Sequence, residues 1–264
     1  MADLDIIIPV YNEAENILEI LHSLHRHVKT SFRVLICYDH EGDTTLAALR
    51  AYSSTGVDII PVRNRGQGIH SAVVTGIYVS TAPAVLVFPA DDKENAGIID
   101  HLVSACRQGY EVVAPSRFMP GGCMRGCPWL KALLVRTAAF ALYHFAIVPT
   151  HDATNGFRLF SRRVLDSVEI ESSQGGTYSI ELLVKCHRLG WPIAEVPAVW
   201  LERSAGKSRF RLFRWVPSYL RWFLYAFATT YLRRGACTVP LRQATRGLRV
   251  VPRPLAVPIG SDKS

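Results

Sequence analysis

The chain alternates short apolar runs, rich in β-branched residues, with stretches whose apolar residues recur every three or four positions. The runs predict buried strands, and the stretches between them predict amphipathic helices. Strands that are apolar throughout are typical of a mostly parallel α/β sheet with helices on both faces. The predicted strands are Asp5–Val10, Arg33–Tyr38, Val57–Val62, Ala84–Phe88 and Tyr110–Ala114, and the predicted helices are Glu13–Val28, Asp43–Ser54, Ile69–Ser80 and Gly97–Arg107.

A second region follows over about residues 115–202. It contains a long apolar stretch at Trp129–Val148, a turn at His151–Phe157 and a helical pattern at Ser179–Leu189. Trp129–Val148 has the length of a membrane span, yet it carries Lys131 and Arg136, and charged residues are rare within spans. We expect a packed or interfacial helix there.

The loops after the five predicted strands hold the residues that point to chemistry. Ligands of parallel α/β sheets bind at the carboxyl ends of the strands. Carboxylates there could hold a divalent cation, and glycines before a helix N-terminus let the backbone approach a phosphate. The combination suits a nucleotide diphosphate. The candidates, in strand order, are Pro9, Tyr11 and Glu13; Asp39; Gly66 and Gly68; Ala90, Asp91 and Asp92; and Arg117.

A series of motifs over about residues 5–210 resembles the dolichol-phosphate mannose synthase branch of the family-2 glycosyltransferases. The late motifs are the specific ones: Asp152 to Arg158, Glu181, Glu195–Pro197 and Glu202–Ser208. The resemblance implies a GT-A fold for a catalytic domain at residues 1–208. It also implies inverting transfer of a hexose, mannose first, from a nucleotide sugar of the GDP-mannose or UDP-glucose type to a polyprenyl phosphate. The motifs read IIIPVYNEAENI, YDHEGDTT, NRGQG, PADDKEN, APSRFMPGG, HDATNGFRLF, SIELLVKCHRLGWPIAEVPAVW and ERSAGKSRF.

Roles for single residues follow from this resemblance. It implies a nucleoside pocket at Pro9, Tyr11 and Glu13, and base recognition by Asp39. Arg117 matches an arginine near the phosphates, whereas Lys131, Arg203 and Lys207 match basic positions near the acceptor phosphate. Asp91 and Arg117 are the expected catalytic residues, together with Asp152. Asp152 and Glu181 are expected either to bind sugar hydroxyls or to brace the acceptor loop.

The expected metal motif is incomplete. Asp91 matches its second carboxylate, but Pro89 and Lys93 stand where the family has an Asp and a Gln, and a charged lysine cannot coordinate a cation. We expect Mg²⁺ or Mn²⁺ at Asp91, with Asp92 or Glu94 supplying the missing ligand. Alternatively, Lys93 replaces part of the positive charge of the metal.

Two other functions stay open. A family-2 transferase that glycosylates a hydroxyl of a glycan or glycolipid would need a general base, and Asp152 is the candidate. A relative that binds sugar nucleotides without catalysis would form no product. An acceptor phosphate, by contrast, is already an anionic nucleophile at neutral pH and needs no base.

Basic residues are concentrated at the C-terminal end of the chain. Residues 1–202 hold 17 Lys/Arg and 21 Asp/Glu, a balance of −4, whereas residues 203–264 hold 13 Lys/Arg and one acid, a balance of +12. Such a block indicates an anionic partner. Residues 209–236 combine arginines with aromatic residues, and Pro217 is expected to divide them into two helices.

This pattern favours helices that lie in a membrane interface, because the longest uncharged apolar stretch there, Trp222–Leu232, is too short to span a bilayer. A packed helix is the alternative, and nothing upstream resembles a nucleic-acid module. Residues 237–264 are predicted to be a disordered tail. With no basic leader or cleavage site at Met1, we expect a peripheral or monotopic protein at the cytoplasmic face of a membrane, without a transmembrane helix.

Overall fold

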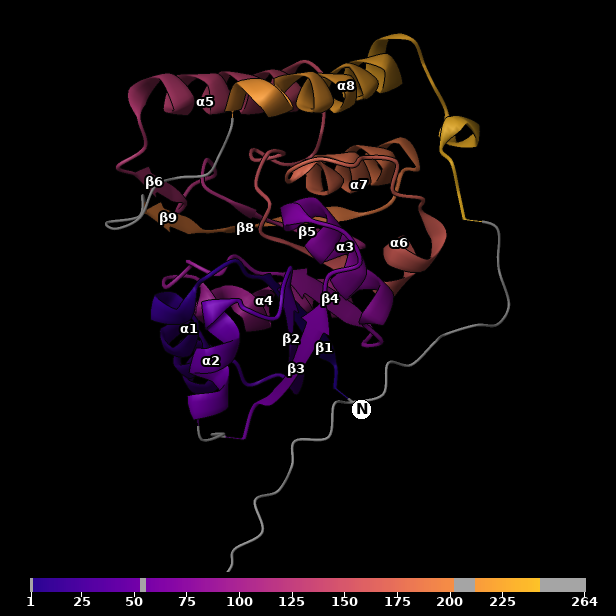
Figure 1. Ribbon diagram of the computed structural model, residues 1–264. Coiled ribbons are helices and arrows are strands. Elements are labelled where there is room, and N and C mark those ends of the chain that lie inside the picture. The colour runs from indigo at the N-terminus through magenta and orange to yellow at the C-terminus, as the bar shows by residue number, and fades with distance from the viewer. Residues whose placement is uncertain (1, 53–55, 202–211, 243–264) are drawn as a thin grey trace, which may run out of the picture.

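A seven-stranded sheet forms the centre of the protein, seen here in a computed structural model that describes residues 2–52, 56–201 and 212–242 (Figure 1). The strand order is β3-β2-β1-β4-β7-β5-β8. β7 runs antiparallel to its neighbours β4 and β5, whereas the other neighbouring strands are parallel. The strands are β1 Leu4–Pro9, β2 Phe32–Tyr38, β3 Asp58–Arg63, β4 Ala84–Val87, β5 Val112–Ser116, β7 Arg158–Ser161 and β8 Ile193–Pro197; a second, two-stranded sheet pairs β6 Cys123–Arg125 with β9 Val199–Leu201.

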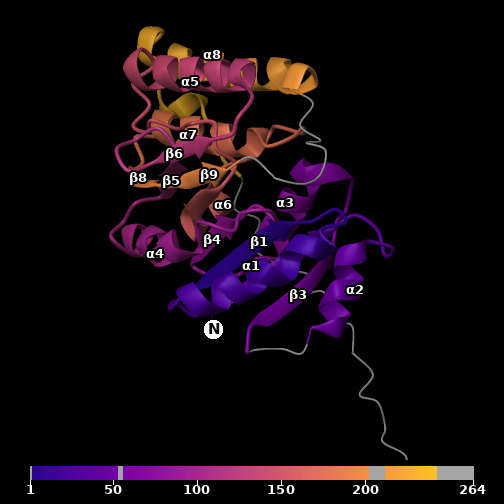
Figure 2. The same cartoon turned by 90° about the vertical axis from the view of Figure 1, so that its left-hand side faces the viewer.

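Helices cover both faces of the large sheet, as predicted (Figures 1 and 2). Alternate residues of β1 show why: Ile6 and Ile8 pack in one apolar core, and Ile7 packs in the other, on the opposite face. The first core includes residues of α1 Ala14–His27, α2 Thr44–Ala51 and α4 Ile99–Arg107, which follows the short 3-10 helix η1 Ala96–Ile98. The second includes residues of α3 Gly68–Val79, α6 Arg162–Ser167 and α7 Thr177–Arg188.

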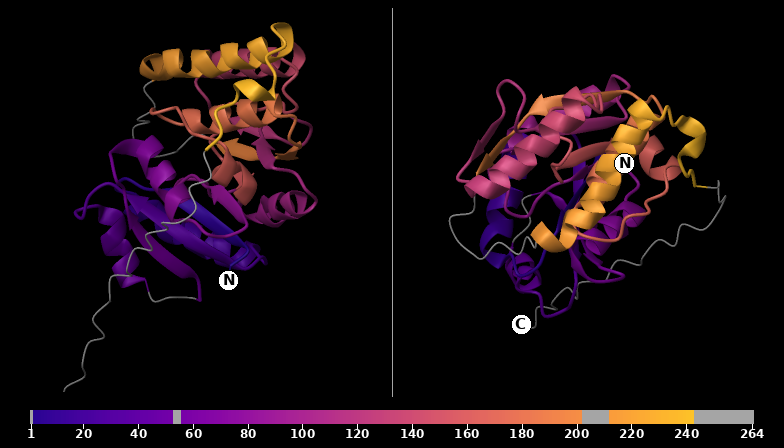
Figure 3. Two further views of the ribbon diagram at one scale, coloured as in Figure 1. Left: turned by 90° about the vertical axis from the view of Figure 1, so that its right-hand side faces the viewer. Right: turned by 90° about the horizontal axis from the view of Figure 1, so that it is seen from above.

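Two long helices, α5 Trp129–His144 and α8 Leu212–Tyr231, form an outer layer above α7 (Figure 1). They lie side by side when seen from above (Figure 3), and the Thr230 hydroxyl of α8 donates to the Ala146 carbonyl at 2.7 Å. On the inner side of α8, Trp222 and Ala226 are fully buried in the core that α7 shares. In the described part of the chain, every helix falls short of the length and apolarity needed to cross a membrane.

The C-terminal segment differs from its prediction in two respects. α8 continues through Pro217 as one helix, so the expected division into two helices is wrong. A proline removes one helical N–H but has a helix-compatible φ, and the burial of Trp222 and Ala226 offsets the lost hydrogen bond. Residues 237–242, expected in a disordered tail, dock on the body: η2 spans Ala236–Thr238, and Leu241 forms an antiparallel bridge with Val168. Residues 243–264 lie outside the described residues.

Candidate active site

The sheet topology brings the predicted loops to one edge. β1 to β4 run parallel, and β5 has the same direction because β7 is antiparallel to both β4 and β5. The carboxyl ends of these five strands therefore share an edge, and the residues that lead into β7 start from that edge too. The chain order along the sheet reverses between β1 and β4, the position where ligands of open α/β sheets bind.

The loop after β1 is held by the start of α2. Asp43 caps α2 by accepting from the Thr45 N–H at 2.9 Å, and its carboxylate also accepts from the Asn12 N–H at 3.0 and 3.1 Å. Asn12 needs this support because its φ is 56°, a left-handed conformation. Asp43 was not among the predicted site residues, although the Asp-Thr-Thr capping pattern points to it.

The candidate nucleoside residues flank this loop. Pro9 ends β1, and the Glu13 N–H donates to the Thr45 hydroxyl at 2.9 Å. Tyr11 is 44% exposed and meets His40 edge to face, with ring centroids 5.5 Å apart. Tyr11 and His40 thus bring together the ends of β1 and β2 and present an exposed aromatic ring.

Asn64 joins the loops after β2 and β3. Its amide donates to Asp39 at 2.6 Å, and its carbonyl oxygen accepts from the Gly66 N–H at 3.0 Å. The other oxygen of Asp39 accepts from the Gly68 N–H at 2.9 Å. Gly68 has a φ of +81°, and a Cβ on Gly66 would lie 2.5 Å from the Ser71 hydroxyl, so both positions favour glycine. Asn64 belongs to the NRGQG motif, but its connecting role was not predicted from the sequence.

The loop after β4 carries the predicted metal residues. Ala90 is buried and Asp91 half-buried. Asp92 accepts from the Asn95 amide at 2.9 and 2.7 Å, and Asn95 in turn bonds the Val199 backbone of β9. Burial raises the pKa of Asp92, against the opposing effect of the Asn95 hydrogen bonds. Asp92 therefore closes its own loop and anchors it to the smaller sheet.

These residues do not fit a metal centre built by the protein. The described chain contains no group of three His, Cys, Asp or Glu side chains placed to hold an ion. Both oxygens of Asp92 are engaged by Asn95, and the Lys93 ammonium pairs with Glu19 of α1. Binding of Mg²⁺ or Mn²⁺ by Asp91 and Asp92 therefore stays a prediction, and the Lys93 charge is paired with Glu19.

Arg117 and Asp152 form the buried charge pair of the site. The Arg117 Nε and Nη2 donate to the two Asp152 oxygens at 2.6 and 2.9 Å, and Asp152 is fully buried. Burial lowers the pKa of Arg117, but the Asp152 carboxylate outweighs it, so the pKa lies above its ordinary value. This geometry favours the bracing role for Asp152 over that of a general base, because both oxygens already accept from Arg117.

A second guanidinium lies behind this pair. Arg158 is fully buried and donates to the carbonyls of Ser179 at 3.1 Å and Asp152 at 2.9 Å. Burial lowers the pKa of Arg158 to about 10, although the Asp152 carboxylate acts in the opposite direction. Within the described residues its Nε has no hydrogen-bond partner. Arg158 therefore fixes the 152–157 turn from beneath.

A basic cleft of about 860 Å³ opens beside Arg117, between the 117–125 segment and α5. Its cationic side chains are Arg117, Arg125 and Arg136, and aromatic and sulfur-containing residues form much of the rest. Lys131 lies over the Trp200 ring at 5.0 Å, so Arg136 rather than Lys131 is the α5 cation that lines the cleft. The lining residues are Arg117, Phe118, Met119, Gly122, Cys123, Met124, Arg125, Arg136, Thr137, Ala139, Phe140, Tyr143, His144 and His151.

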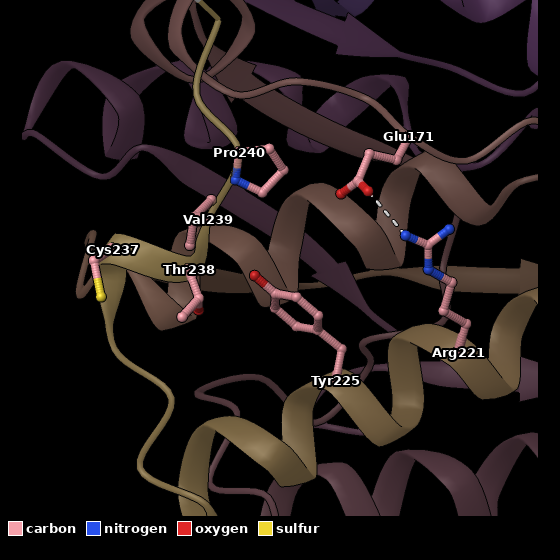
Figure 4. Close-up of a pocket in the computed structure, with 7 residues that line it drawn as sticks. All are labelled: Glu171, Arg221, Tyr225, Cys237, Thr238, Val239 and Pro240. Carbon is pink, nitrogen blue, oxygen red and sulfur yellow. Dashed lines mark hydrogen bonds and ion pairs between the residues drawn. The ribbon is translucent and has the colours of Figure 1, made fainter.

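The loop before α7 is held by buried charges of α7 and by an exposed ion pair with α8. Glu181 accepts from the Ser172 N–H at 2.9 Å, which fixes the loop before α7, and from Lys185 at 2.7 Å. Lys185 also forms an ion pair with Glu171 at 2.7 Å. Glu171 in turn accepts a hydrogen bond from Arg221 of α8 at 2.9 Å (Figure 4). Both Glu181 and Lys185 are fully buried.

A side chain of α3 also contacts the loop before α7. His70 of α3 makes a 2.8 Å hydrogen bond between Nε2 and the Ser172 hydroxyl. Burial lowers the pKa of His70, although Glu181 acts in the opposite direction. Arg203 and Lys207, predicted to bind the acceptor, lie outside the described residues.

The chain is similar in sequence to two named mannosyl-transferring enzymes. The chain is 29% identical over 211 residues to the polyprenol monophosphomannose synthase of Mycolicibacterium smegmatis, covering 77% of this chain and 79% of the relative. It is 24% identical over 209 residues to the dolichol-phosphate mannosyltransferase of Pyrococcus furiosus, covering 78% of this chain and 58% of that protein.

The solved structures support the fold. Glucosyl-3-phosphoglycerate synthase of Mycobacterium tuberculosis, solved with Mn²⁺, UDP and glucosyl-3-phosphoglycerate, superimposes with a TM-score of 0.61 at 17% identity, covering 90% of this chain and 81% of that one. The fold is GT-A, as the resemblance implied. The Glycosyl transferase family 2 profile matches residues 5–168, more than half of the chain. The protein is therefore a glycosyltransferase that belongs to family 2.

Proposed function

We propose that the enzyme transfers mannose from a nucleotide sugar to a polyprenyl phosphate at a membrane surface. Two relatives named for this chemistry, the polyprenol monophosphomannose synthase and the dolichol-phosphate mannosyltransferase, support the substrate classes. The observation that best supports the proposal is the basic cleft beside Arg117. Phe140 lines this cleft and is also 56% exposed on the outer face of α5, so a ligand with an anionic head and an apolar tail matches both surfaces.

The outer faces of α5 and α8 support a membrane-facing surface. Exposed apolar side chains recur at helical spacing on both helices: Trp129, Leu130, Leu133, Leu134 and Phe140 on α5, and Val216, Leu220, Leu224 and Tyr231 on α8. Contiguous exposed apolar surface of this kind marks an interaction site. Arg221 instead pairs with Glu171 of the body, so an apolar rather than a basic stripe would meet the lipid. We therefore propose residues 1–208 as the catalytic domain and α5 with α8 as its membrane contact.

In the proposed reaction, a phosphate oxygen of the acceptor attacks the anomeric carbon. The bond from that carbon to the donor diphosphate breaks, and the nucleoside diphosphate leaves with the bonding electrons. Because the acceptor is already an anion, no general base is required, which agrees with the closed Arg117–Asp152 pair. We assign the stabilisation of phosphate charge to Arg117, and donor binding to Asp39, Asp91 and the Tyr11 loop.

The alternative reaction, with a hydroxyl acceptor, has less support. Its candidate base, Asp152, is fully buried and accepts from Arg117 through both oxygens. A base must reach the proton that it removes. Retaining this alternative would require Asp152 to leave its partner.

Product analysis tests the proposal. The full chain is incubated with vesicles that contain polyprenyl phosphate. Parallel reactions each receive one radiolabelled sugar nucleotide: GDP-mannose, UDP-glucose or a related compound. The expected result is label in the lipid extract, with mannose the best donor sugar and release by mild acid. Label that resists mild acid would indicate a hydroxyl acceptor, and no transfer from any donor would contradict the proposal.

Membrane contact is tested separately by vesicle flotation. Replacing Leu133 and Leu224 with Glu should reduce flotation with anionic vesicles at least tenfold, because both side chains are more than half exposed on adjacent helices. Tyr110→Glu, at an exposed residue before β5, is the matched control and should float normally. Equal flotation of all three proteins would show that the α5–α8 face does not bind lipid.

A further inference from the structure

His151 and Glu195 form a fixed pair at the wall of the basic cleft. The His151 Nδ1 lies 2.5 Å from one Glu195 oxygen, and the second oxygen accepts from the His151 N–H at 2.8 Å and from the Thr150 hydroxyl at 3.1 Å. The side chains are 31% and 16% exposed, respectively. Both oxygens of Glu195 are therefore used to hold Thr150 and His151 of the 150–152 turn.

The orientation of the imidazole is set on a second side as well. The Tyr143 ring of α5 stacks on His151 with centroids 3.8 Å apart and planes 25° apart. A carboxylate on Nδ1 fixes that nitrogen as a donor and leaves Nε2 as the nitrogen available to a ligand. Nε2 donates to a phosphate oxygen from the imidazolium form, in which both ring nitrogens carry a proton. In the described part of the chain, Nε2 of His151 makes no hydrogen bond, although the residue lines the cleft.

The surroundings of His151 define the ligand that the cleft suits. Asp152, the next residue, holds Arg117, which lines the same cleft together with Arg136. Phe118 and Phe140 supply apolar wall, and Arg136 lies 5.6 Å from the Phe118 ring. Two guanidinium groups and an oriented imidazole next to aromatic rings suit a phosphate monoester that carries an apolar chain.

We propose that His151 is a further acceptor-binding residue, which Glu195 orients so that its Nε2 hydrogen-bonds a phosphate oxygen of the acceptor beside Arg117. The acceptor's identity rests on the proposed function, but the phosphate contact itself does not. Glu195 acts through His151 and is a positioning residue.

Binding is tested without any transfer reaction. The imidazole ¹⁵N signals of the full chain are followed by NMR while octyl phosphate or inorganic phosphate is added, and His151→Gln identifies the signal of His151. Octyl phosphate should shift the His151 signal at concentrations at least fivefold below those needed for inorganic phosphate, because the aromatic walls contact the alkyl chain. No shift with octyl phosphate, or equal response to both ligands, would overturn the proposal.

Kinetics give the second measurement. His151→Ala should raise the KM for polyprenyl phosphate about 5- to 20-fold while kcat and nucleotide affinity stay within twofold, as expected for one lost hydrogen bond to a charged group. His151→Gln, whose amide can replace the Nε2 donor, should restore most of the affinity. His101→Ala, in α4 on the other face of the sheet, is the control. A purely structural role predicts instead that both variants at position 151 lose stability with an unchanged KM.

The two proposals can fail separately. If octyl phosphate shifts the His151 signal but the enzyme forms no lipid-linked sugar, the phosphate site stands and the proposed reaction is wrong. If lipid-linked product forms and His151→Ala has a normal KM, the reaction stands and the His151 assignment is overturned.

Discussion

The loops of β1 to β4 and the region that follows β5 are held together in different ways. In the first region, most of the connecting hydrogen bonds come from neutral groups. The Asn64 amide links Asp39 to Gly66, and backbone N–H groups donate to Asp43. In the second region, ionisable side chains are fully buried, among them Asp152, Arg158 and Lys185, each with 0% exposure. Within the described residues, all the fully buried cationic side chains belong to this second region.

This contrast has an energetic consequence. A loop built on neutral hydrogen bonds can lose one contact for about 1 kcal/mol, whereas a buried ion that loses its partner costs several times more. The β1–β4 loops can therefore adjust to a nucleotide at modest cost. The region around Arg117 keeps a single arrangement, which suits a site that must hold an acceptor phosphate in line with the sugar.

The largest expected effect comes from breaking the buried pair. Asp152→Ala should lower the free energy of unfolding by about 3–5 kcal/mol, because Arg117 would keep a buried charge without its partner. Chemical denaturation with circular dichroism measures the change. Asp39→Ala, in the β1–β4 loops, should lower the free energy of unfolding by less than about 2 kcal/mol. Similar losses in the two variants would remove the contrast between the regions.

An intermediate effect is expected at the cap of α2. Asp43→Ala should destabilise the protein by about 1–2 kcal/mol, since a helix N-cap is lost together with the support of Asn12. Asp43→Asn retains an acceptor oxygen and should recover at least half of this loss. An alanine variant as stable as the parent protein would mean that Asn12 holds its left-handed conformation without Asp43.

The smallest effect concerns pH and the contact between the two regions. The pKa of His70 lies below its ordinary value of 6.5, so the unfolded chain binds a proton at this residue more readily than the folded chain. The stability that depends on neutral His70 is present above about pH 6.5 and is lost as the pH falls towards the folded pKa. His70→Gln should therefore show a smaller loss of stability between pH 7 and pH 5 than the parent. Parallel curves for both proteins would contradict this assignment.

The sequence predicted the first region well because its signals are local. The five predicted strands match the observed ones within about two residues, since apolar runs and strand ends are read directly from neighbouring residues. The loops named as the site also lie together at one edge. The contacts within them were not predictable in the same way: Asp39 and Asn64 are 25 residues apart, and Asn12 and Asp43 are 31 apart.

The second region depended on contacts that no local pattern contains. Glu181 and Lys185 lie one helical turn apart in α7, and only the folded chain shows that both are fully buried and paired. The hydrogen bonds from the Asn95 amide to Asp92, and from Asn95 to the Val199 backbone, were not predicted. Pro217 was expected to divide the C-terminal segment into two helices, but α8 is continuous and buries Trp222. For the buried Glu181–Lys185 pair and for α8, tertiary packing decides the outcome.

The central claim is that the β1–β4 loops bind the donor and the cleft beside Arg117 binds the acceptor. It is tested most directly by measuring nucleotide affinity and the KM for polyprenyl phosphate in Asp39→Ala and Arg136→Ala side by side. Asp39→Ala should weaken nucleotide binding about 5- to 100-fold, with the acceptor KM unchanged. Arg136→Ala should raise the acceptor KM about tenfold, with nucleotide affinity unchanged. If both variants change the same constant, the two regions do not divide the substrates and the account is wrong.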